Sequence, residues 1–412
     1  MQSRLNFPLR AKSGTPADSR NGLLAAWLFG LALFGYPVVA VLISLLQIDS
    51  RTLSIPFRLF VAAAGFVLLA KSPPLKLGAA RSLLIFIWST YTLRLLQNTF
   101  ARQVEGADYA LMFFFAGALI PAIALMAAST WHQTLFARIS LALSVAVCML
   151  VLIGNMGGEF GESDLTEASG RLNVVALNPI SLANLAVSAI LCAAVLWRKA
   201  TVTWRLGFLI AIALAFQTLV ATGSKGPALA LAICWVVWSL RRVSARWPLI
   251  LLALPVASFV LIGSESALLE RVAASAEDLS TLDRLVLIEN SLAQIAESPI
   301  FGSAFVELES GVYPHNILLE AAMALGIPIA LAFAGLLIFG VSRAWQALDS
   351  PDTELLGLLY LQSIVEGAVS GAMFGAALMW ITLALLLRPS AYVVSRVPKS
   401  KSKSKSILRI RE

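Results

Sequence analysis

Long apolar runs recur along the whole sequence, and the first of them extends from Gly22 to Gln47. A helix needs about 20 consecutive apolar residues to cross the hydrocarbon core of a bilayer. Of the 412 residues, 59% are hydrophobic and 13% are charged, whereas an average soluble domain has about 25% charged residues. The sequence therefore predicts an all-α, polytopic membrane protein with about twelve transmembrane helices and without a large soluble domain.

Polar segments divide the sequence into two tails and a transmembrane domain. The apolar run that follows residues 1–21 is longer than the core of a signal peptide, which has about 7 to 15 residues. We therefore expect residues 1–21 to form a cytoplasmic N-terminal tail before an uncleaved first span. Residues 22–387 would form the transmembrane domain, and the Lys- and Ser-rich residues 388–412 would form a basic cytoplasmic tail.

One long polar stretch, residues 263–314, separates the ninth expected span from the tenth. Within it, the pattern over Thr281–Glu297 predicts an amphipathic helix. The eighth span follows the turn at Thr222–Gly226 and ends at Arg241-Arg242. The other expected spans cover residues 22–47, 57–70, 82–97, 109–128, 135–153, 172–197, 206–221, 248–262, 316–341, 355–370 and 373–387.

The basic residues indicate how the chain crosses the membrane. Lys and Arg outnumber Asp and Glu by 31 to 23, which gives a net charge of +8. When the spans alternate in direction, most of these cations fall on the side of the N-terminal tail, as cytoplasmic segments require. We therefore expect both termini in the cytoplasm, contacts with membrane lipids, and no nucleic-acid partner. The three cysteines, Cys148, Cys192 and Cys234, fall within expected spans and lack metal-ligand spacing, which predicts core residues without disulfides.

Several charged residues lie at the outer ends of expected spans, where topology does not explain them. Arg171 precedes the sixth span, Lys225 occupies a turn flanked by glycines, and Arg284 lies in the long polar stretch. Arginine binds an anion such as diphosphate through a planar fork, and lysine binds it as a point charge. The cations at this depth are therefore candidates for an anion site. The alternative is that each is a solvated charge or a partner of an outer carboxylate.

A histidine and a carboxylate occur where the polar stretch meets the tenth span. His315 has an imidazole, whose ordinary pKa of about 6.5 allows proton transfer near neutral pH, although an interfacial histidine can also have no role. Glu320 lies about one turn further, so the two residues would share roughly one helix face. A second carboxylate, Glu366, falls in the eleventh span. Because a charge within a span costs about 2.5 to 3.5 kcal/mol, we expect partners for both carboxylates, with Arg94 and Arg58 as candidates, in structural ion pairs or in a functional site.

Common catalytic motifs are absent from the sequence. It contains neither the Gly-x-x-x-x-Gly-Lys-Ser/Thr phosphate loop nor a Gly-x-Gly-x-x-Gly after a strand. The second histidine, His132, is expected on the cytoplasmic side, away from His315. We therefore expect no metal and no cofactor, and an activated donor that carries its own energy, as a lipid diphosphate does.

Four short motifs follow one another between residues 171 and 375. The clearest is His315-Asn316, followed after nine residues by Gly326. The others are Arg171 with Leu177-Asn178-Pro179 and Ala183-Asn184, then Thr222-Gly223-Ser224-Lys225-Gly226, and then Arg284 with Glu297-Ser298-Pro299-Ile300-Phe301-Gly302. Together they resemble the O-antigen ligase and polymerase superfamily of bacterial envelope proteins. Two positions depart from the family pattern, because Lys225 stands where an arginine is usual and Ile329 replaces the last glycine of the ligase signature.

The resemblance implies a GT-C-like membrane glycosyltransferase in the bacterial inner membrane, with a periplasmic active site and loop at residues 263–314. It would transfer a glycan from undecaprenyl diphosphate to a hydroxyl of lipid A-core, without a metal. In the polymerase version, the acceptor is a second lipid-linked glycan. The resemblance implies that His315 is the general base, that Arg171, Lys225 and Arg284 bind the diphosphate, and that Glu320 orients His315.

A secondary transporter is the alternative from another class, because many transporters also have about twelve spans. Transporters bind their substrates near the bilayer midplane, between repeated halves built from broken helices. The sequence shows no clear internal repeat, and its unusual charges lie at the outer ends of spans. The enzyme is therefore the favoured interpretation.

Overall fold

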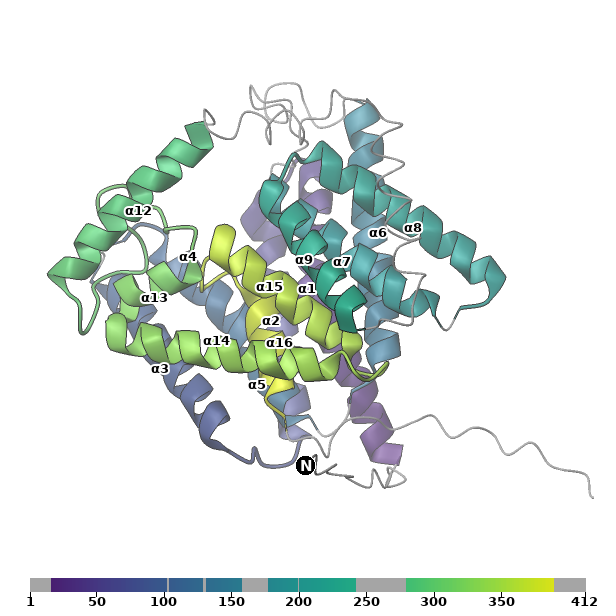
Figure 1. The fold of residues 1–412 in the computed structure, drawn as a ribbon, viewed down its shortest axis with the longest axis horizontal. Helices are drawn as coiled ribbons and strands as arrows, with labels where there is room; N and C mark the ends of the chain where they lie inside the picture. Colours follow the sequence, from purple (N-terminus) through teal and green to yellow (C-terminus); the bar gives the residue numbers. More distant parts are fainter. Residues whose placement is uncertain are drawn as a thin grey trace, which may run out of the picture.

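The computed structural model describes residues 16–101, 104–128, 131–157, 177–198, 200–241 and 279–388. Every regular element in this part of the chain is a helix, and the helices pack into one bundle (Figure 1). This confirms the all-α prediction for the described residues. Arg171, the expected ninth span at 248–262, most of residues 1–21 and nearly all of the basic tail at 388–412 lie outside them.

The helices follow the expected apolar segments closely. Residues 107–127 form one continuous helical segment whose middle turns are a π-helix, η1. The expected amphipathic helix at Thr281–Glu297 is present as α12. The elements are α1 (Pro16–Leu46), α2 (Ser50–Ala70), α3 (Ala79–Phe100), α4 (Ala107–Met112), η1 (Phe113–Leu119), α5 (Ile120–Ala127), α6 (Gln133–Gly157), α7 (Pro179–Trp197), α8 (Val202–Ala221), α9 (Lys225–Arg241), α12 (Leu279–Glu297), α13 (Ile317–Leu325), α14 (Ile327–Ala347), α15 (Glu354–Val369) and α16 (Ala377–Leu386).

The length and composition of these helices show a polytopic membrane protein. Among the described residues, 7 helical segments are long and apolar enough to cross a membrane. They are Arg20–Leu46, Ser50–Ala70, Ala107–Ala127, Gln133–Gly154, Pro179–Trp197, Val202–Ala221 and Ile327–Ala347. The total of about twelve spans stays a prediction, since a further expected span lies outside the described residues.

The outward faces of these helices are apolar. On α2, Leu59 and Phe60 are 58% and 59% exposed, whereas Val61 and Leu68 on the opposite face are buried. A helix that is apolar on both faces is stable when its outer face contacts lipid rather than water. The exposed leucines and phenylalanines therefore mark the lipid-facing surface.

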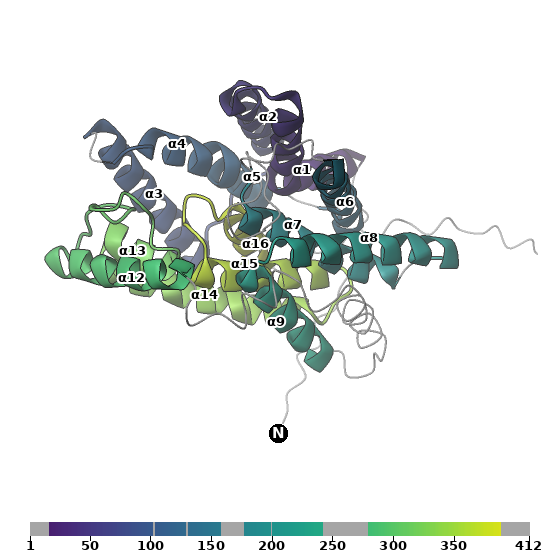
Figure 2. The same ribbon diagram turned by 90° about the horizontal axis from the view of Figure 1, so that it is seen from above.

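Helix α15 lies near the centre of the bundle. It packs against α7, α9, α14 and α16, and Figure 2 shows it between α12 and α13 on one side and α8 on the other. Leu355, Leu358, Leu359 and Tyr360 on this helix are all 0% exposed. The N-terminal half of α15 is thereby held in the core, and the candidate site is built around the other end of the helix.

The predicted tenth span is wrong as one continuous helix, because the chain breaks at Gly326 into α13 and α14. Gly326 has a φ of +84°, which favours glycine. A Cβ at this position would lie 2.0 Å from the carbonyl oxygen of Ile300. The amide of Ile327 then donates to the carbonyl of Pro299 at 2.8 Å. The loop that precedes the tenth span therefore fills the space where a straight helix would continue.

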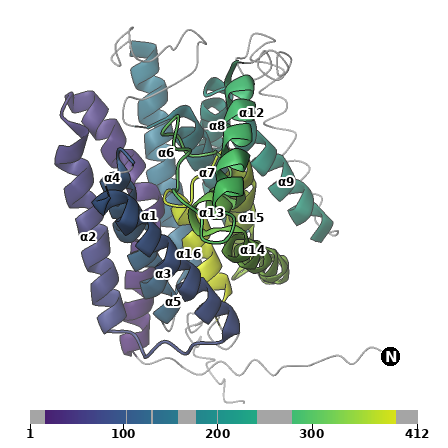
Figure 3. The same cartoon turned by 90° about the vertical axis from the view of Figure 1, so that its left-hand side faces the viewer.

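The helix ends that were expected in the cytoplasm lie next to one another. Asn21 at the start of α1 donates to the carbonyl of Lys71 after α2, at 3.2 Å. At the α14–α15 connection, Arg198 pairs with Glu354 at 3.0 Å, and Arg241 pairs with Asp349. Figure 3 shows the α2–α3 connection at one end of the bundle and the upper part of α12 at the other. This sorting agrees with the alternation on which the predicted topology depends.

Candidate active site

The C-terminal end of α15 is the point where the candidate residues meet. The amide nitrogen Nδ2 of Asn316 donates to the carbonyl oxygen of Ala368 at 2.9 Å. The Nη1 atom of Arg284 on α12 donates to the carbonyl oxygen of Val369 at 3.2 Å. The last carbonyl groups of a helix lack partners within the helix and carry partial negative charge, so cationic and amide donors bind there favourably. One helix end thus holds both α12 and the loop that bears the histidine.

His315 lies in the loop directly before α13, at the boundary where the sequence placed it. Its φ is +53°, in the left-handed region that few residues other than glycine adopt. Asn316 caps α13 by accepting from the amides of Leu318 and Leu319 at 3.0 and 3.1 Å. The half-buried imidazole of His315 packs against the ring of Tyr313, with 4.4 Å between the ring centroids. The cap therefore fixes the start of α13 and leaves His315 in the loop before it.

The surroundings of His315 favour the neutral imidazole. Burial lowers the pKa of His315 from its ordinary value, and the nearby charge of Arg284 lowers it further, while a backbone hydrogen bond with Ser370 acts in the opposite direction. The Nδ1 atom is buried and has no hydrogen-bond partner among the described residues. In its neutral form an imidazole has one ring nitrogen with a lone pair, which can accept a proton.

Lys225 begins α9, whose first turn packs against the same end of α15. It is half-buried and is the first residue of α9, after a turn in which Gly223 has a φ of +59°. A Cβ added to Gly226 would lie 3.4 Å from Val369, so the start of α9 packs closely against the end of α15. The first amides of a helix attract anions, so Lys225 adds its charge to a position that already favours negative groups.

The role expected for Glu320 is not matched by its contacts. Glu320 is 0% exposed. One of its oxygens accepts from the hydroxyl of Tyr91 at 2.5 Å, and the other accepts from the amide of Met373 at 2.7 Å. Both oxygens thus join α13 to α3 and to the chain before α16, and no hydrogen bond among the described residues connects Glu320 to His315. The physical reason is that His315 leaves the helix with a positive φ, so the two side chains do not share a helix face.

The arginines proposed as carboxylate partners bind other groups. Arg94 donates to the carbonyl oxygens of Ala324 at 2.6 Å, Phe301 at 2.6 Å and Ser303 at 2.9 Å. It thereby fastens the loop at 301–303 to α3 and α13. The predicted pairing of Arg94 with Glu320 or Glu366 is therefore wrong, because backbone carbonyls occupy its guanidinium.

Arg58 is buried in an aromatic cage instead of an ion pair. It donates to the hydroxyl of Tyr109 at 3.0 Å, and its guanidinium lies 4.7, 5.0 and 4.4 Å from the ring centroids of Tyr36, Tyr109 and Phe113. Cation–π contacts of this kind stabilise a desolvated arginine. Glu366, the other expected carboxylate, accepts from Gln362 on its own helix at 2.7 Å.

Sequence reasoning missed two aromatic residues at the site, Tyr91 and Tyr313. Tyr313 lies two residues before His315 in the sequence, which is a local signal, but its stacking depends on the turn. Tyr91 is 229 positions from Glu320, and no local pattern indicates that contact.

In the described part of the chain, no group of three or more His, Cys, Asp or Glu residues could hold a metal ion.

The described residues thus define a class of protein: a polytopic helical membrane protein that brings an imidazole and an arginine together at one end of a central helix, against which the start of α9 packs. Residues 210–334 match the family model described as O-antigen ligase. The match confirms the resemblance to the O-antigen ligase and polymerase superfamily and, with the membrane helices, supports a ligase- or polymerase-like membrane enzyme. It includes Lys225, Arg284, His315 and Glu320, whereas Arg171 precedes it. No curated protein matches the chain.

Proposed function

We propose that this protein transfers a glycan from undecaprenyl diphosphate to a sugar hydroxyl of lipid A-core at the periplasmic face of a bacterial inner membrane. The observation that supports this most directly is the meeting of His315 and Arg284 at the end of α15, with the start of α9, which carries Lys225, packed against the same end. A proton acceptor and two cations are the groups that such a transfer needs. The family match over residues 210–334 includes all three.

In this proposal, His315 is the general base. The acceptor hydroxyl gives its proton to the neutral imidazole as its oxygen forms a bond with the anomeric carbon of the donor sugar. The bond between that carbon and the diphosphate oxygen breaks, and undecaprenyl diphosphate leaves with the electron pair. The lowered pKa of His315 supports this role, because the imidazole is then unprotonated at neutral pH.

Arg284 and Lys225 bind the departing diphosphate in this proposal, together with Arg171. The negative charge on the diphosphate grows as the glycosidic bond breaks, so fixed cations stabilise the transition state more than the ground state. No metal ion takes part, since diphosphate is already a good leaving group. Glu320 acts as a positioning residue, because it holds α13 against Tyr91 and Met373 and so fixes the helix that follows His315.

The test is transfer in vitro by the purified protein, with an undecaprenyl-diphosphate-linked glycan and lipid A-core. His315→Ala should lower kcat by about 10²- to 10⁴-fold, the usual contribution of a general base. Arg284→Ala should lower it by about 10²- to 10³-fold, as the loss of a transition-state contact does. Full activity in both variants would reject the assignment.

The control is His132→Ala, which removes the second histidine of the chain, at the opposite end of the bundle and just before α6. This variant should retain wild-type activity. Incubation with the donor alone separates the ligase from the polymerase alternative, because a polymerase joins lipid-linked repeats in the absence of lipid A-core. A secondary transporter would move its substrate without forming a new glycosidic bond in either mixture.

A further inference from the structure

Arg58 is a buried cation that the proposed transfer reaction does not use. It lies on α2, is 3% exposed, and forms no ion pair within the described residues. Its Nη2 atom donates to the hydroxyl of Tyr109, but its Nη1 atom is buried and has no hydrogen-bond partner in this part of the chain. A buried donor without an acceptor is costly, and in a native protein it indicates a strained site or a site for a bound water or ion.

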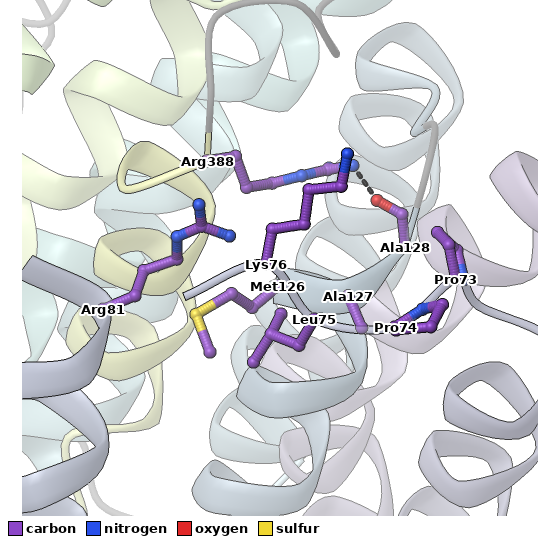
Figure 4. Close-up of a pocket in the computed structure, with 9 residues that line it drawn as sticks. All are labelled: Pro73, Pro74, Leu75, Lys76, Arg81, Met126, Ala127, Ala128 and Arg388. Atoms are coloured by element: carbon purple, nitrogen blue, oxygen red, sulfur yellow. Dashed lines mark hydrogen bonds between the residues drawn. The ribbon is translucent and has the colours of Figure 1, made fainter. Parts of the chain in front are cut away.

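Two other arginines of the bundle show what the Nη1 atom of Arg58 lacks. Arg94 donates to several backbone carbonyl groups, and Arg388 donates to the carbonyl oxygen of Ala128, as the dashed line in Figure 4 shows. The guanidinium of Arg58 instead lies over aromatic rings. Rings attract the charge through their faces but supply no oxygen acceptor, so Arg58 keeps its capacity to bind an oxyanion.

Two tyrosine hydroxyls lie beside this guanidinium. Tyr109 accepts from Arg58, so its own hydroxyl hydrogen points elsewhere and can be donated. The hydroxyl of Tyr36, a half-buried residue on α1, lies within hydrogen-bonding reach of Arg58 and Tyr109. A guanidinium flanked by hydroxyl donors matches the several oxygens of a phosphate group, to which charged donors bind more strongly than neutral ones.

The surface next to Arg58 faces lipid rather than water. Leu59 and Phe60, the next two residues of α2, are exposed and apolar, and Tyr109 is exposed on α4. Tyrosines of this kind are typical of the membrane interface, where one end of the ring is in lipid and the other meets headgroups. The ligand that fits is therefore an anion carried by an apolar molecule, as the phosphate of a lipid is.

A row of aromatic rings places Arg58 at the end of the bundle that carries His315. Phe113 lies over the guanidinium of Arg58, and its ring packs edge-on against Phe374, with 6.3 Å between the centroids. Phe374 packs in the same way against Tyr313 at 5.8 Å, and Tyr313 packs against His315. Phe113 also begins the π-helix η1, and π-helical turns occur frequently at functional sites. The site is thus on the predicted periplasmic side.

We infer that Arg58, together with the hydroxyls of Tyr36 and Tyr109, binds the phosphate group of a membrane lipid. The acyl chains of this lipid lie against the exposed face of α2. The lipid is either a bulk phospholipid or, if the proposed function holds, one of the two lipid substrates.

The experiment uses the full-length protein, purified in a neutral detergent and stripped of lipid. Its affinities for phosphatidylglycerol and for diacylglycerol with the same acyl chains are measured by native mass spectrometry, so that the pair differs only in the phosphate headgroup. The wild type should bind phosphatidylglycerol about tenfold more tightly or better, since a hydrogen bond to a charged group contributes that much. Arg58→Gln should lose this preference, and Arg58→Lys should keep part of it.

Tyr109→Phe tests the site without removing the buried cation. It keeps the ring that lies against Arg58 and removes only the hydroxyl, so the bundle should fold even if Arg58→Gln does not. The affinity for phosphatidylglycerol should fall about three- to tenfold, as expected for one neutral hydrogen bond, and the affinity for diacylglycerol should stay unchanged. Wild-type affinity for phosphatidylglycerol in Tyr109→Phe would overturn the inferred site.

Two matched variants serve as controls. Arg51→Gln removes an exposed charge from the start of the same helix, and Tyr360→Phe removes a hydroxyl that donates to the carbonyl of Leu337. Both should bind phosphatidylglycerol as the wild type does. Equal losses in Arg51→Gln and Arg58→Gln would overturn the inference, because they would show a general effect of net charge. Equal affinity of the wild type for the two lipids would overturn it as well.

Two further measurements identify the source of the phosphate. Inorganic phosphate that competes as strongly as phosphatidylglycerol would overturn the assignment to a lipid. In the transfer assay, a higher KM for one lipid substrate in Tyr109→Phe, with kcat unchanged, assigns the phosphate to that substrate. An unchanged KM assigns it to a bulk phospholipid. The binding measurements need no transfer activity, so their outcome is independent of whether the proposed function is correct.

Discussion

His315 combines a left-handed backbone, a half-buried ring and an Nδ1 atom that has no hydrogen-bond partner in the described part of the chain. Residues held in this backbone region cost of the order of 1–3 kcal/mol, and they persist when the surrounding structure fixes them. Here the fixing contacts come from Asn316, which caps α13 and also binds the end of α15. The strain at His315 is thus maintained by the next residue, and it directs the imidazole toward α15 and Arg284.

The pH dependence of transfer should follow the pKa of His315. Burial and Arg284 both lower this pKa, so kcat/KM should be high at neutral pH and fall only as the pH drops below the ordinary histidine range. Arg284→Gln removes one positive charge, which raises the pKa of His315 and moves the acid limb of the profile to higher pH. The measurement is kcat/KM against pH for both proteins. The exposed Arg51→Gln should leave the limb in place, and an unmoved limb in Arg284→Gln would contradict this account of the pKa.

The contacts of Glu320 predict an energetic coupling to Tyr91. In Glu320→Gln, a single oxygen remains to accept from two buried donors, Tyr91 and Met373. One donor is left unpaired, at a cost of about 1–3 kcal/mol. Tyr91→Phe should also destabilise the protein, and the double variant should lose less than the sum of the two single losses. Thermal unfolding of the four proteins measures this, and strictly additive losses would show that the contact contributes nothing.

At the scale of the elements, the break between α13 and α14 fixes the position of the helix that follows His315. The loop at 299–303 packs against it, with Ser303 donating to the carbonyl of Met323 at 2.7 Å. Arg94 binds three successive carbonyl groups of that loop, those of Phe301, Gly302 and Ser303. The loop therefore joins α13, α14 and α3 into one packed unit, and α13 is the helix that follows His315. Only glycine fits at position 326 in this unit, because the loop backbone occupies the space of a side chain.

Gly326→Ala should prevent this packing. The added Cβ would meet the backbone of Ile300, and alanine is strained at a φ of +84°, so we expect a loss of about 3 kcal/mol or more. The matched control is Gly335→Ala on α14, where nothing lies within 4 Å of the added Cβ. That change should be neutral or stabilise the helix by up to about 1 kcal/mol. The yield of monodisperse protein and its thermal unfolding distinguish the two, and equal behaviour would contradict the packing argument.

At the scale of the whole molecule, the sequence predicted the helices better than the contacts between them. The pattern over Thr281–Glu297 predicted α12 to within two residues at its start, because an amphipathic period is a local property. Asn178-Pro179 likewise begins α7, where the Asn178 side chain accepts from Ser181 at 2.8 Å. Local side-chain chemistry is sufficient for such signals.

Contacts between distant segments could not be predicted in the same way. The run from Asn316 to Val341 is apolar throughout most of its length, and this pattern predicts one span. The break at Gly326 depends on the loop at 299–303, which is distant in the sequence and packs against it. Arginines within the spans were expected to pair with carboxylates, but Arg94 donates to backbone carbonyl groups. Hydropathy reports how deep a residue lies and not which group it faces. The sequence therefore predicted which residues belong to the candidate site and at which membrane depth they lie. It did not predict the contacts between them.

The predicted orientation can be tested with added cysteines. The native residues Cys148, Cys192 and Cys234 are all 0% exposed, so they should not react with a membrane-impermeant maleimide. Glu289→Cys, exposed on α12, should react in intact spheroplasts, whereas Lys71→Cys, exposed after α2, should react only after the membrane is permeabilised. The reverse pattern would invert the topology and place the candidate site in the cytoplasm.

The carbonyl groups that end α15 bind both Arg284 and Asn316. A single helix end therefore holds Arg284 in place relative to the loop that bears His315. The chain that joins α12 to α13 is itself fastened to α12, because Gln294 donates to the carbonyl of Val306 and accepts from the amide of Leu308. An insertion there should therefore disturb the contacts of the helix that carries Arg284.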